Sequence, residues 1–263
     1  MRNRLKSLLQ EGTLCKNGWL SIPSGFSAEL MARAGWDSIT IDLQHGVQDY
    51  STMVSCLQGM ANSSAVPLVR VPSNEPGIIG KVLDAGAWGV ICPMVNSAEE
   101  AGALVASCLY PPDGARSNGP IRAVAYGDHE PYQSFANREV LVIPMIETAE
   151  AVERMDEILD VPGISGAYVG PSDLSLSLGL PPVFDHEEPR IIAIYGRILA
   201  ACARRGLFAG IHTASPAYAA RMVGLGFRFV TIASDASLIA AGARQALSLF
   251  QENLDPRKLA AHA

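Results

Sequence analysis

Residue types that could carry out metal or acid–base chemistry follow several apolar runs of this 263-residue sequence. Asp173 comes just after the apolar run 167–169 and the turn 170–172, and Glu147 directly follows the apolar run 141–146. An Asp in such a place could cap the next helix by accepting hydrogen bonds from its free N–H groups. It could also be a metal ligand at the carboxyl end of a strand, so Asp173 has two open interpretations.

Glu147 and Asp173 considered together indicate more than either residue alone. If they follow consecutive strands of one sheet, their carboxylates should be neighbours, and they repel unless a cation or a proton lies between them. Oxygen ligands of this kind suit Mg²⁺ or Mn²⁺, with Co²⁺ as a further candidate. The pair could instead do acid–base work, as in glycosidases. Glu147 alone could be a first-turn helix residue favoured by the helix dipole.

A cation and two histidines lie at the ends of other apolar runs. Arg70 closes the run 67–69, where a guanidinium needs an anion, either a substrate carboxylate or a structural Asp. His45, three residues after Asp42, could act as a base. His212 ends another run and is the weaker candidate. The remaining histidines, predicted to be solvent-exposed loop or tail residues, are His129, His186 and His262.

The elements that must position these residues alternate along the chain. Eight apolar runs read as strands buried on both faces: Gly18–Ile22, Ser38–Leu43, Pro67–Val71, Gly89–Pro93, Leu141–Ile146, Gly166–Val169, Phe208–Ile211 and Phe229–Ala233. The predicted helices are Ser27–Ala34, Tyr50–Ala61, Pro76–Ala85, Ala98–Cys108, Ala149–Leu159, Arg190–Arg204, Ala217–Leu225 and Ser237–Glu252. This alternation predicts an α/β fold, a (β/α)8 TIM barrel formed as a single domain by residues 1–263. A doubly wound sheet is the alternative, but the turn 22–26 lacks the G-x-G-x-x-G fingerprint.

One joint recurs in residues 31–42, 82–93 and 222–233. Each is the end of a helix, then a Gly, an aromatic residue and an apolar strand. The Gly suits the position after a helix where the backbone turns left-handed.

Two longer stretches, 109–139 and 174–189, exceed ordinary connections, and such loops are commonly functional. We expect the first to follow the fourth strand and to lie on the carboxyl face of the barrel, where barrel active sites are found.

The composition limits which classes of binding partner are expected. The chain is 49% hydrophobic, has a net charge of −6 and contains no basic run. Nucleic acid and membranes are therefore not expected as partners, and the N-terminus lacks the long apolar stretch of a secretory signal. The cysteines are scattered, which predicts buried free thiols and a cytoplasmic location: Cys15, Cys56, Cys92, Cys108 and Cys202.

Five motifs in this order resemble one family. They are D-L-Q-H-G (42–46), P-L-V-R-V-P (67–72), Y-P-P-x-G-x-R-S (110–117), P-M-I-E-T (144–148) and V-G-P-S-D-L-S (169–175). Together they resemble the HpcH/HpaI aldolase family, the class II pyruvate aldolases that include 4-hydroxy-2-oxoheptanedioate aldolases. The resemblance implies a (β/α)8 barrel whose C-terminal helix is exchanged between paired subunits, and a homohexamer built as a trimer of dimers.

The resemblance also implies a reaction, the cleavage or formation of a 4-hydroxy-2-oxo acid through a pyruvate-type enolate and an aldehyde. It implies that Glu147 and Asp173 hold the divalent metal, and that Arg70 binds the keto oxygen and stabilises the enolate. The remaining implied roles are proton transfer by His45 and Asp42, contact of Asp84 with His45 from a neighbouring subunit, and binding of the substrate carboxylate by Gly170, Pro171 and Ser172.

Three positions depart from the family pattern. Gln44 stands where Glu is usual, Met145 stands where Gln is usual, and His212 stands near an aliphatic position. His212 should make the aldehyde end of the substrate pocket more polar, so we expect retained enolate chemistry with an altered acceptor. Alternatives are an aldolase for 2-keto-3-deoxy sugar acids, a malyl-CoA or citryl-CoA type lyase, and a non-catalytic dicarboxylate-binding barrel.

Overall fold

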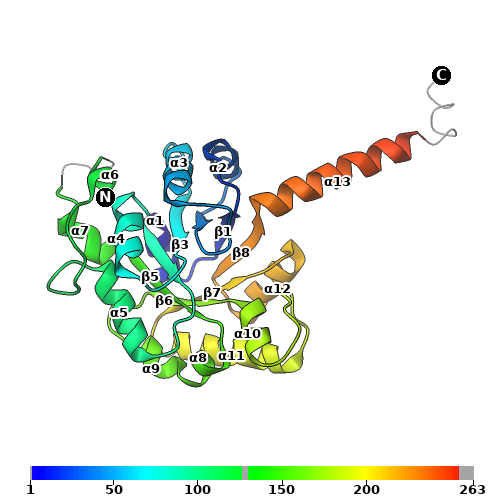
Figure 1. Ribbon diagram of the computed structural model, residues 1–263. Helices are drawn as coiled ribbons and strands as arrows, with labels where there is room; N and C mark the ends of the chain where they lie inside the picture. Colours follow the sequence, from blue (N-terminus) through cyan, green and yellow to red (C-terminus); the bar gives the residue numbers. More distant parts are fainter. Residues whose placement is uncertain (1, 126–129, 255–263) are drawn as a thin grey trace.

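Eight parallel strands close into a barrel in the order of the chain (Figure 1). The structure is a computed structural model that describes residues 2–125 and 130–254. The strands are β1 (Cys15–Leu20), β2 (Ser38–Asp42), β3 (Val66–Arg70), β4 (Gly89–Cys92), β5 (Leu141–Ile146), β6 (Gly166–Val169), β7 (Phe208–His212) and β8 (Phe229–Ser234). The predicted (β/α)8 barrel is therefore confirmed.

Helices surround this barrel. They are α1 (Arg4–Gln10), α2 (Gly25–Ala32), α3 (Tyr50–Met60), α4 (Pro76–Asp84), α5 (Ala98–Cys108), α6 (Ile121–Val124), α7 (Gln133–Glu139), α8 (Ala149–Glu153), α9 (Met155–Leu159), α10 (Pro171–Ser177), α11 (Pro189–Ala203), α12 (Pro216–Leu225) and α13 (Asp235–Asn253). The sequence patterns missed α1, α6, α7 and α10, and the helix predicted over 149–159 is broken at Arg154 into α8 and α9.

Apolar side chains fill two layers, one on each face of the strands. The barrel interior is packed by large residues such as Trp19, Leu68, Ile143, Tyr168 and Phe229. A second, larger cluster lies between the strands and the outer helices. Burial on both faces explains why the strands carry continuous apolar runs, since neither face meets water.

The recurring glycine joint has the predicted conformation. Gly35, Gly86 and Gly226 follow α2, α4 and α12 with φ of +91°, +107° and +125°. A side chain is strained in this region, so Gly ends the helix and turns the chain into the next strand.

The described residues of the stretch 109–139, which are 109–125 and 130–139, lie at the end of the barrel opposite to the one we predicted. Helix α5 separates them from β4, so they connect α5 to β5 and reach the amino ends of the strands. There Asn3 donates from Nδ2 to the carbonyl oxygens of Trp88 and Glu139. The expectation of a loop over the carboxyl face was wrong because the helix α5 had not been counted between strand and loop.

Helix α13 projects away from the barrel (Figure 1). Its apolar side chains Ile239, Leu247 and Phe250 are 60%, 65% and 63% exposed. A capping box between Ser234 and Ser237 starts the helix. The single chain shows the projection and does not test the predicted exchange between subunits.

The five cysteines are free and buried, as predicted. Within residues 2–125 and 130–254, no helix is both long and apolar enough to cross a membrane.

Candidate active site

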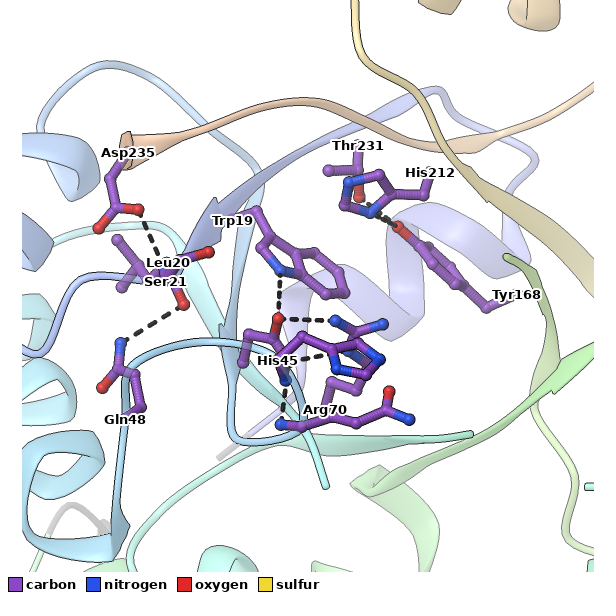
Figure 2. Close-up of polar contacts among 12 residues, drawn as sticks. Trp19, Leu20, Ser21, His45, Gln48, Arg70, Tyr168, His212, Thr231 and Asp235 are labelled. Carbon is purple, nitrogen blue, oxygen red and sulfur yellow. Dashed lines mark hydrogen bonds and ion pairs between the residues drawn. The ribbon is translucent and has the colours of Figure 1, made fainter. Parts of the chain in front are cut away.

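Asp42 and Arg70 form a buried ion pair at the carboxyl ends of β2 and β3. The two residues are register partners. Arg70 donates from Nε to Oδ1 at 2.8 Å and from Nη2 to Oδ2 at 2.6 Å (Figure 2). Their side chains are only 11% and 3% exposed. The guanidinium is thus fixed by a two-pronged contact, which leaves Nη1 without a hydrogen bond to any described residue.

Trp19, at the end of β1, supports this pair from the barrel interior. Its Nε1 donates to Asp42 Oδ2 at 3.1 Å, and the Arg70 guanidinium lies 4.9 Å from the centre of its ring. Burial alone raises the pKa of Asp42, but the hydrogen bonds and charge of Arg70, with Trp19 adding to them, hold it below its ordinary value. Asp42 is therefore an ionised anchor for Arg70 at neutral pH. The sequence reasoning gave Trp19 no role.

Glu147 follows β5 and is 2% exposed. Its Oε1 accepts a hydrogen bond of 2.9 Å from the backbone N–H of Met94. Burial raises the pKa of Glu147 to about 7, the Met94 N–H opposes this shift, and the charge of Asp173 adds to it. A Cβ atom on Gly170 would lie 2.3 Å from Oε2, so only glycine leaves room for this carboxylate.

Asp173 lies in the first turn of α10, directly after β6. Gly170 is the N-cap residue of that helix, and no side chain caps it, so the cap interpretation of Asp173 is wrong. Pro171 occupies the first helical position, where a missing N–H costs nothing. The Ser172 N–H lies in the first turn, where backbone donors have no partner within the helix.

The two carboxylates fit a divalent cation. Glu147 is buried beside the charge of Asp173 and keeps Oε2 free of hydrogen bonds to the described residues, which is costly for a carboxylate pair without a counter-charge. Over the described chain, no three His, Cys, Asp or Glu side chains gather as a metal site. Two carboxylates suffice for Mg²⁺, because this ion keeps several water or substrate ligands.

His45 and Gln44 lie in the loop after β2. The backbone N–H groups of both residues donate to Asp42 Oδ1, at 3.3 and 3.1 Å, so this loop is anchored on the carboxylate that holds Arg70. The His45 residue itself is exposed. The structure therefore brings His45, Asp42 and Arg70 together on one edge of the barrel.

Asp84 lies away from this group within the same chain. It ends α4, which returns to the amino ends of the strands, and it accepts a hydrogen bond of 2.6 Å from Arg116 Nη2. The Arg116 side chain is fully buried between Tyr110 and Tyr132. The contact of Asp84 with His45 of another subunit stays a prediction.

His212 ends β7 and packs against the other side of Trp19. The two ring centres are 4.7 Å apart, and His212 Nδ1 lies 3.2 Å from the Tyr168 hydroxyl. Phe184 covers the imidazole at 5.1 Å. Burial, with a smaller effect of the Arg70 charge, holds the pKa of His212 well below its ordinary value. His212 is therefore a neutral polar group at neutral pH.

His186 is buried, which contradicts its predicted exposure. Its Nε2 lies 2.5 Å from the Ser175 hydroxyl on α10, and its carbonyl oxygen accepts from the Tyr218 hydroxyl. It ties the segment after α10 to the helix that carries Asp173. Ser175 ends the motif of residues 169–175, but His186 lies outside every motif, so no sequence pattern predicts this contact. His129 and His262 lie outside the described residues.

Met145 is buried in the barrel interior, two residues before Glu147. Its methyl carbon would lie 2.9 Å from a Cβ on Gly170. This departure from the family pattern therefore places an apolar group next to Gly170 and Glu147.

A closed parallel barrel with two carboxylates, an arginine and a histidine at the carboxyl ends of its strands has the arrangement of a barrel enzyme, whose active site lies at that face. Residues 19–241 match the model of the HpcH/HpaI aldolase/citrate lyase family, and the chain belongs to that family. It is 38% identical over 247 residues to a hydroxypyruvate/pyruvate aldolase of Rhizorhabdus wittichii, covering 94% of this chain and 98% of that protein. It is 36% identical over 252 residues to a 4-hydroxy-2-oxo-heptane-1,7-dioate aldolase of Salmonella paratyphi A, covering 95% of each chain.

The fold comparison agrees. A crystal structure of an HpcH/HpaI aldolase/citrate lyase family protein from Burkholderia cenocepacia matches with a TM-score of 0.89 at 33% identity, covering 95% of this chain and 99% of that one.

Proposed function

We propose that this chain is a divalent-metal-dependent class II aldolase that forms or cleaves a 4-hydroxy-2-oxo acid through a pyruvate-type enolate. One observation carries the proposal. Glu147 directly follows β5, Asp173 lies in the first turn after β6 and Arg70 ends β3. An acidic pair and a guanidinium fixed by Asp42 therefore lie at the same end of the barrel. This combination suits a reaction in which negative charge develops on an oxygen.

Glu147 and Asp173 would hold the cation, Mg²⁺ or Mn²⁺, with Co²⁺ as a further candidate. When bound, the cation supplies Lewis-acid polarisation of the keto group of a 2-oxo acid.

Arg70 stabilises the developing charge. Its Nε and Nη2 are engaged by Asp42, so the guanidinium plane is set before substrate binds and Nη1 is left for the keto oxygen. A donor that is already oriented costs no reorganisation when the charge appears. Asp42 therefore acts mainly by holding Arg70.

The donor carboxylate would bind at the start of α10, where the backbone N–H groups of Ser172 and Asp173 are free of helical partners. Gly170 and Pro171 shape this approach. His45 would move the proton, since it is exposed on a loop anchored to Asp42. Asp84 of a neighbouring subunit would assist it.

His212 would face the acceptor aldehyde. Because its imidazole is held neutral and lies beside Tyr168, it offers a hydrogen-bonding surface without a charge. This favours acceptors with hydroxyl or carbonyl groups over purely aliphatic ones.

We also propose that α13 is exchanged in a homohexamer built from dimers. The exposed apolar residues of α13 have a counterpart in Phe26 and Leu30 of α2, which are 69% and 57% exposed. Covering both surfaces would remove a large apolar area from water. The free thiols further support a reducing cytoplasm as the place of action.

The test is proton NMR of pyruvate in D₂O with the enzyme and Mg²⁺, without any aldehyde. We expect the methyl signal to disappear, and EDTA or the variant Glu147→Gln to prevent this. Glu150→Gln is the matched control, because Glu150 is exposed on α8 three residues further on.

Exchange that persists fully in EDTA would contradict the metal dependence. No exchange with any divalent metal would exclude pyruvate as the donor and favour a CoA-ester lyase or a non-catalytic dicarboxylate-binding barrel.

A further inference from the structure

The turn after β4 contains an unusual backbone conformation. Met94 has φ of +57°, and within residues 2–125 and 130–254 every other residue with positive φ is a glycine. Side chains rarely adopt this conformation, and it persists where surrounding contacts fix it, often at functional sites. The Met94 side chain is 50% exposed, so its own packing does not explain the strain.

The strained backbone places one donor. The Met94 N–H donates to Glu147 Oε1 at 2.9 Å, while Oε2 of the same carboxylate lies in the space that Gly170 leaves by having no Cβ. Because one oxygen is held by a backbone group, the carboxylate cannot rotate freely in its buried site. The left-handed turn therefore sets the orientation of Glu147.

Asn96 holds this turn from the other side. Its Nδ2 donates to the Met94 carbonyl oxygen at 3.1 Å, and its Oδ1 accepts from the Thr148 hydroxyl at 2.5 Å. Thr148 is the residue after Glu147. The Asn96 side chain thus links two turns: the one with Met94, whose N–H donates to Glu147, and the one after β5 that contains Glu147 and Thr148.

We propose that Asn96 is a positioning residue that keeps Met94 left-handed and its N–H on Glu147, and thereby sets this carboxylate for a divalent cation. The inference rests on the proposed function for the cation. The hydrogen bond from the Met94 N–H to Glu147 can be tested in the absence of any cation.

A purely structural role is the competing explanation. The Asn96 N–H donates to Glu100 Oε2 at 2.6 Å near the start of α5. This bond comes from the backbone and survives substitution of the side chain. A structural role predicts a lower unfolding temperature in Asn96→Ala with no change at Glu147.

The first experiment measures deuterium exchange at the Met94 amide in the full-length protein. We expect about tenfold faster exchange in Asn96→Ala and in Glu147→Ala than in the unaltered chain, as for loss of one hydrogen bond to a charged group. Asn74→Ala is the matched control, since Asn74 donates to the Glu100 carbonyl oxygen and makes no hydrogen bond to Met94.

The second experiment measures the dissociation constant of Mn²⁺ by electron spin resonance of the free ion. Asn96→Ala should weaken binding by about tenfold or more, because groups that orient a metal ligand commonly contribute that much. Asn74→Ala should bind Mn²⁺ within about twofold of the unaltered chain, since the Asn74 amide donates to the Glu100 carbonyl oxygen and has no hydrogen bond to Met94 or Glu147.

Unchanged Met94 exchange in Glu147→Ala or in Asn96→Ala would overturn the proposal, as would unchanged Mn²⁺ affinity in Asn96→Ala. If the unaltered chain binds no Mn²⁺, the metal part of the proposed function and the cation role of Asn96 both fail. Amide exchange then still decides whether Asn96 orients Glu147.

Discussion

Arg70 and Asp42 meet through two parallel hydrogen bonds of 2.8 and 2.6 Å, and they are register partners on adjacent strands. Because the sheet fixes both backbones, a substitution of either side chain cannot be compensated by a shift of the other residue. Removing one partner of such a buried pair leaves an uncompensated charge and costs about 3–5 kcal/mol.

Asp42→Asn should therefore lower kcat/KM by at least about a hundredfold, because an unfixed guanidinium loses its orientation toward the keto oxygen. Steady-state kinetics of aldol cleavage measure this. Arg70→Lys should be nearly as damaging, since an ammonium cannot make both contacts. Near-normal kinetics in both variants would show that the ion pair has no part in catalysis.

Trp19→Phe keeps a ring under Arg70 but removes the donor to Asp42 Oδ2. We expect an effect of about tenfold or less on kcat with a small change in KM, in line with the loss of one hydrogen bond to a charged group. Trp19→Leu should cost more, because it also removes the aromatic face. Equal losses in the two variants would mean that only the indole N–H matters.

Gly170→Ala should abolish pyruvate methyl exchange, because its Cβ would lie 2.3 Å from Glu147 Oε2 and displace the carboxylate. The matched control is Gly80→Ala in α4, where a Cβ meets nothing within 4 Å. That control should keep its activity and gain up to about 1 kcal/mol of stability. An active Gly170→Ala enzyme would place Oε2 outside the reaction.

His212 should make the protein less stable in mild acid. Its pKa in the folded state is lowered, so the unfolded chain binds the proton more readily. The contribution of His212 to stability is then highest above the unfolded pKa of about 6.5 and falls as the pH drops below it, by up to about 1.4 kcal/mol per pH unit. The raised pKa of Glu147 changes stability in the opposite direction. The His212 contribution is therefore the difference between the unaltered chain and His212→Phe in thermal unfolding at pH 7.5 and pH 5.

His212→Phe should lose less stability than the unaltered chain between pH 7.5 and pH 5, since the imidazole is already packed among Trp19, Tyr168 and Phe184 and the new ring cannot be protonated. A variant with the same loss of stability in acid would assign the effect to other groups.

Much of this fold could be predicted because each strand, buried on both faces, is a continuous apolar run in the sequence. β5 and β6 lie where the apolar runs of 141–146 and 166–169 placed them, and the Gly35, Gly86 and Gly226 joints were readable from local steric rules. Helix α10 was missed because it is short and begins at a Gly-Pro pair, which reads as a turn. The described parts of the stretch 109–139 were predicted at the wrong end of the barrel. They follow the helix α5 and lead into β5, and a segment that connects a helix to the next strand lies at the amino ends of the strands.

The sequence by itself determined the barrel, the family and the chemical types at the mouth, since periodicity and motif order are properties of the chain. Tertiary structure decided what those groups touch. It brought the Arg70–Asp42 ion pair against the ring of Trp19. It also placed the backbone N–H of Met94 on Glu147, and it buried His186 against Ser175. These contacts join segments that only barrel closure brings together, and their strength depends on exclusion of water, which no single segment can achieve alone.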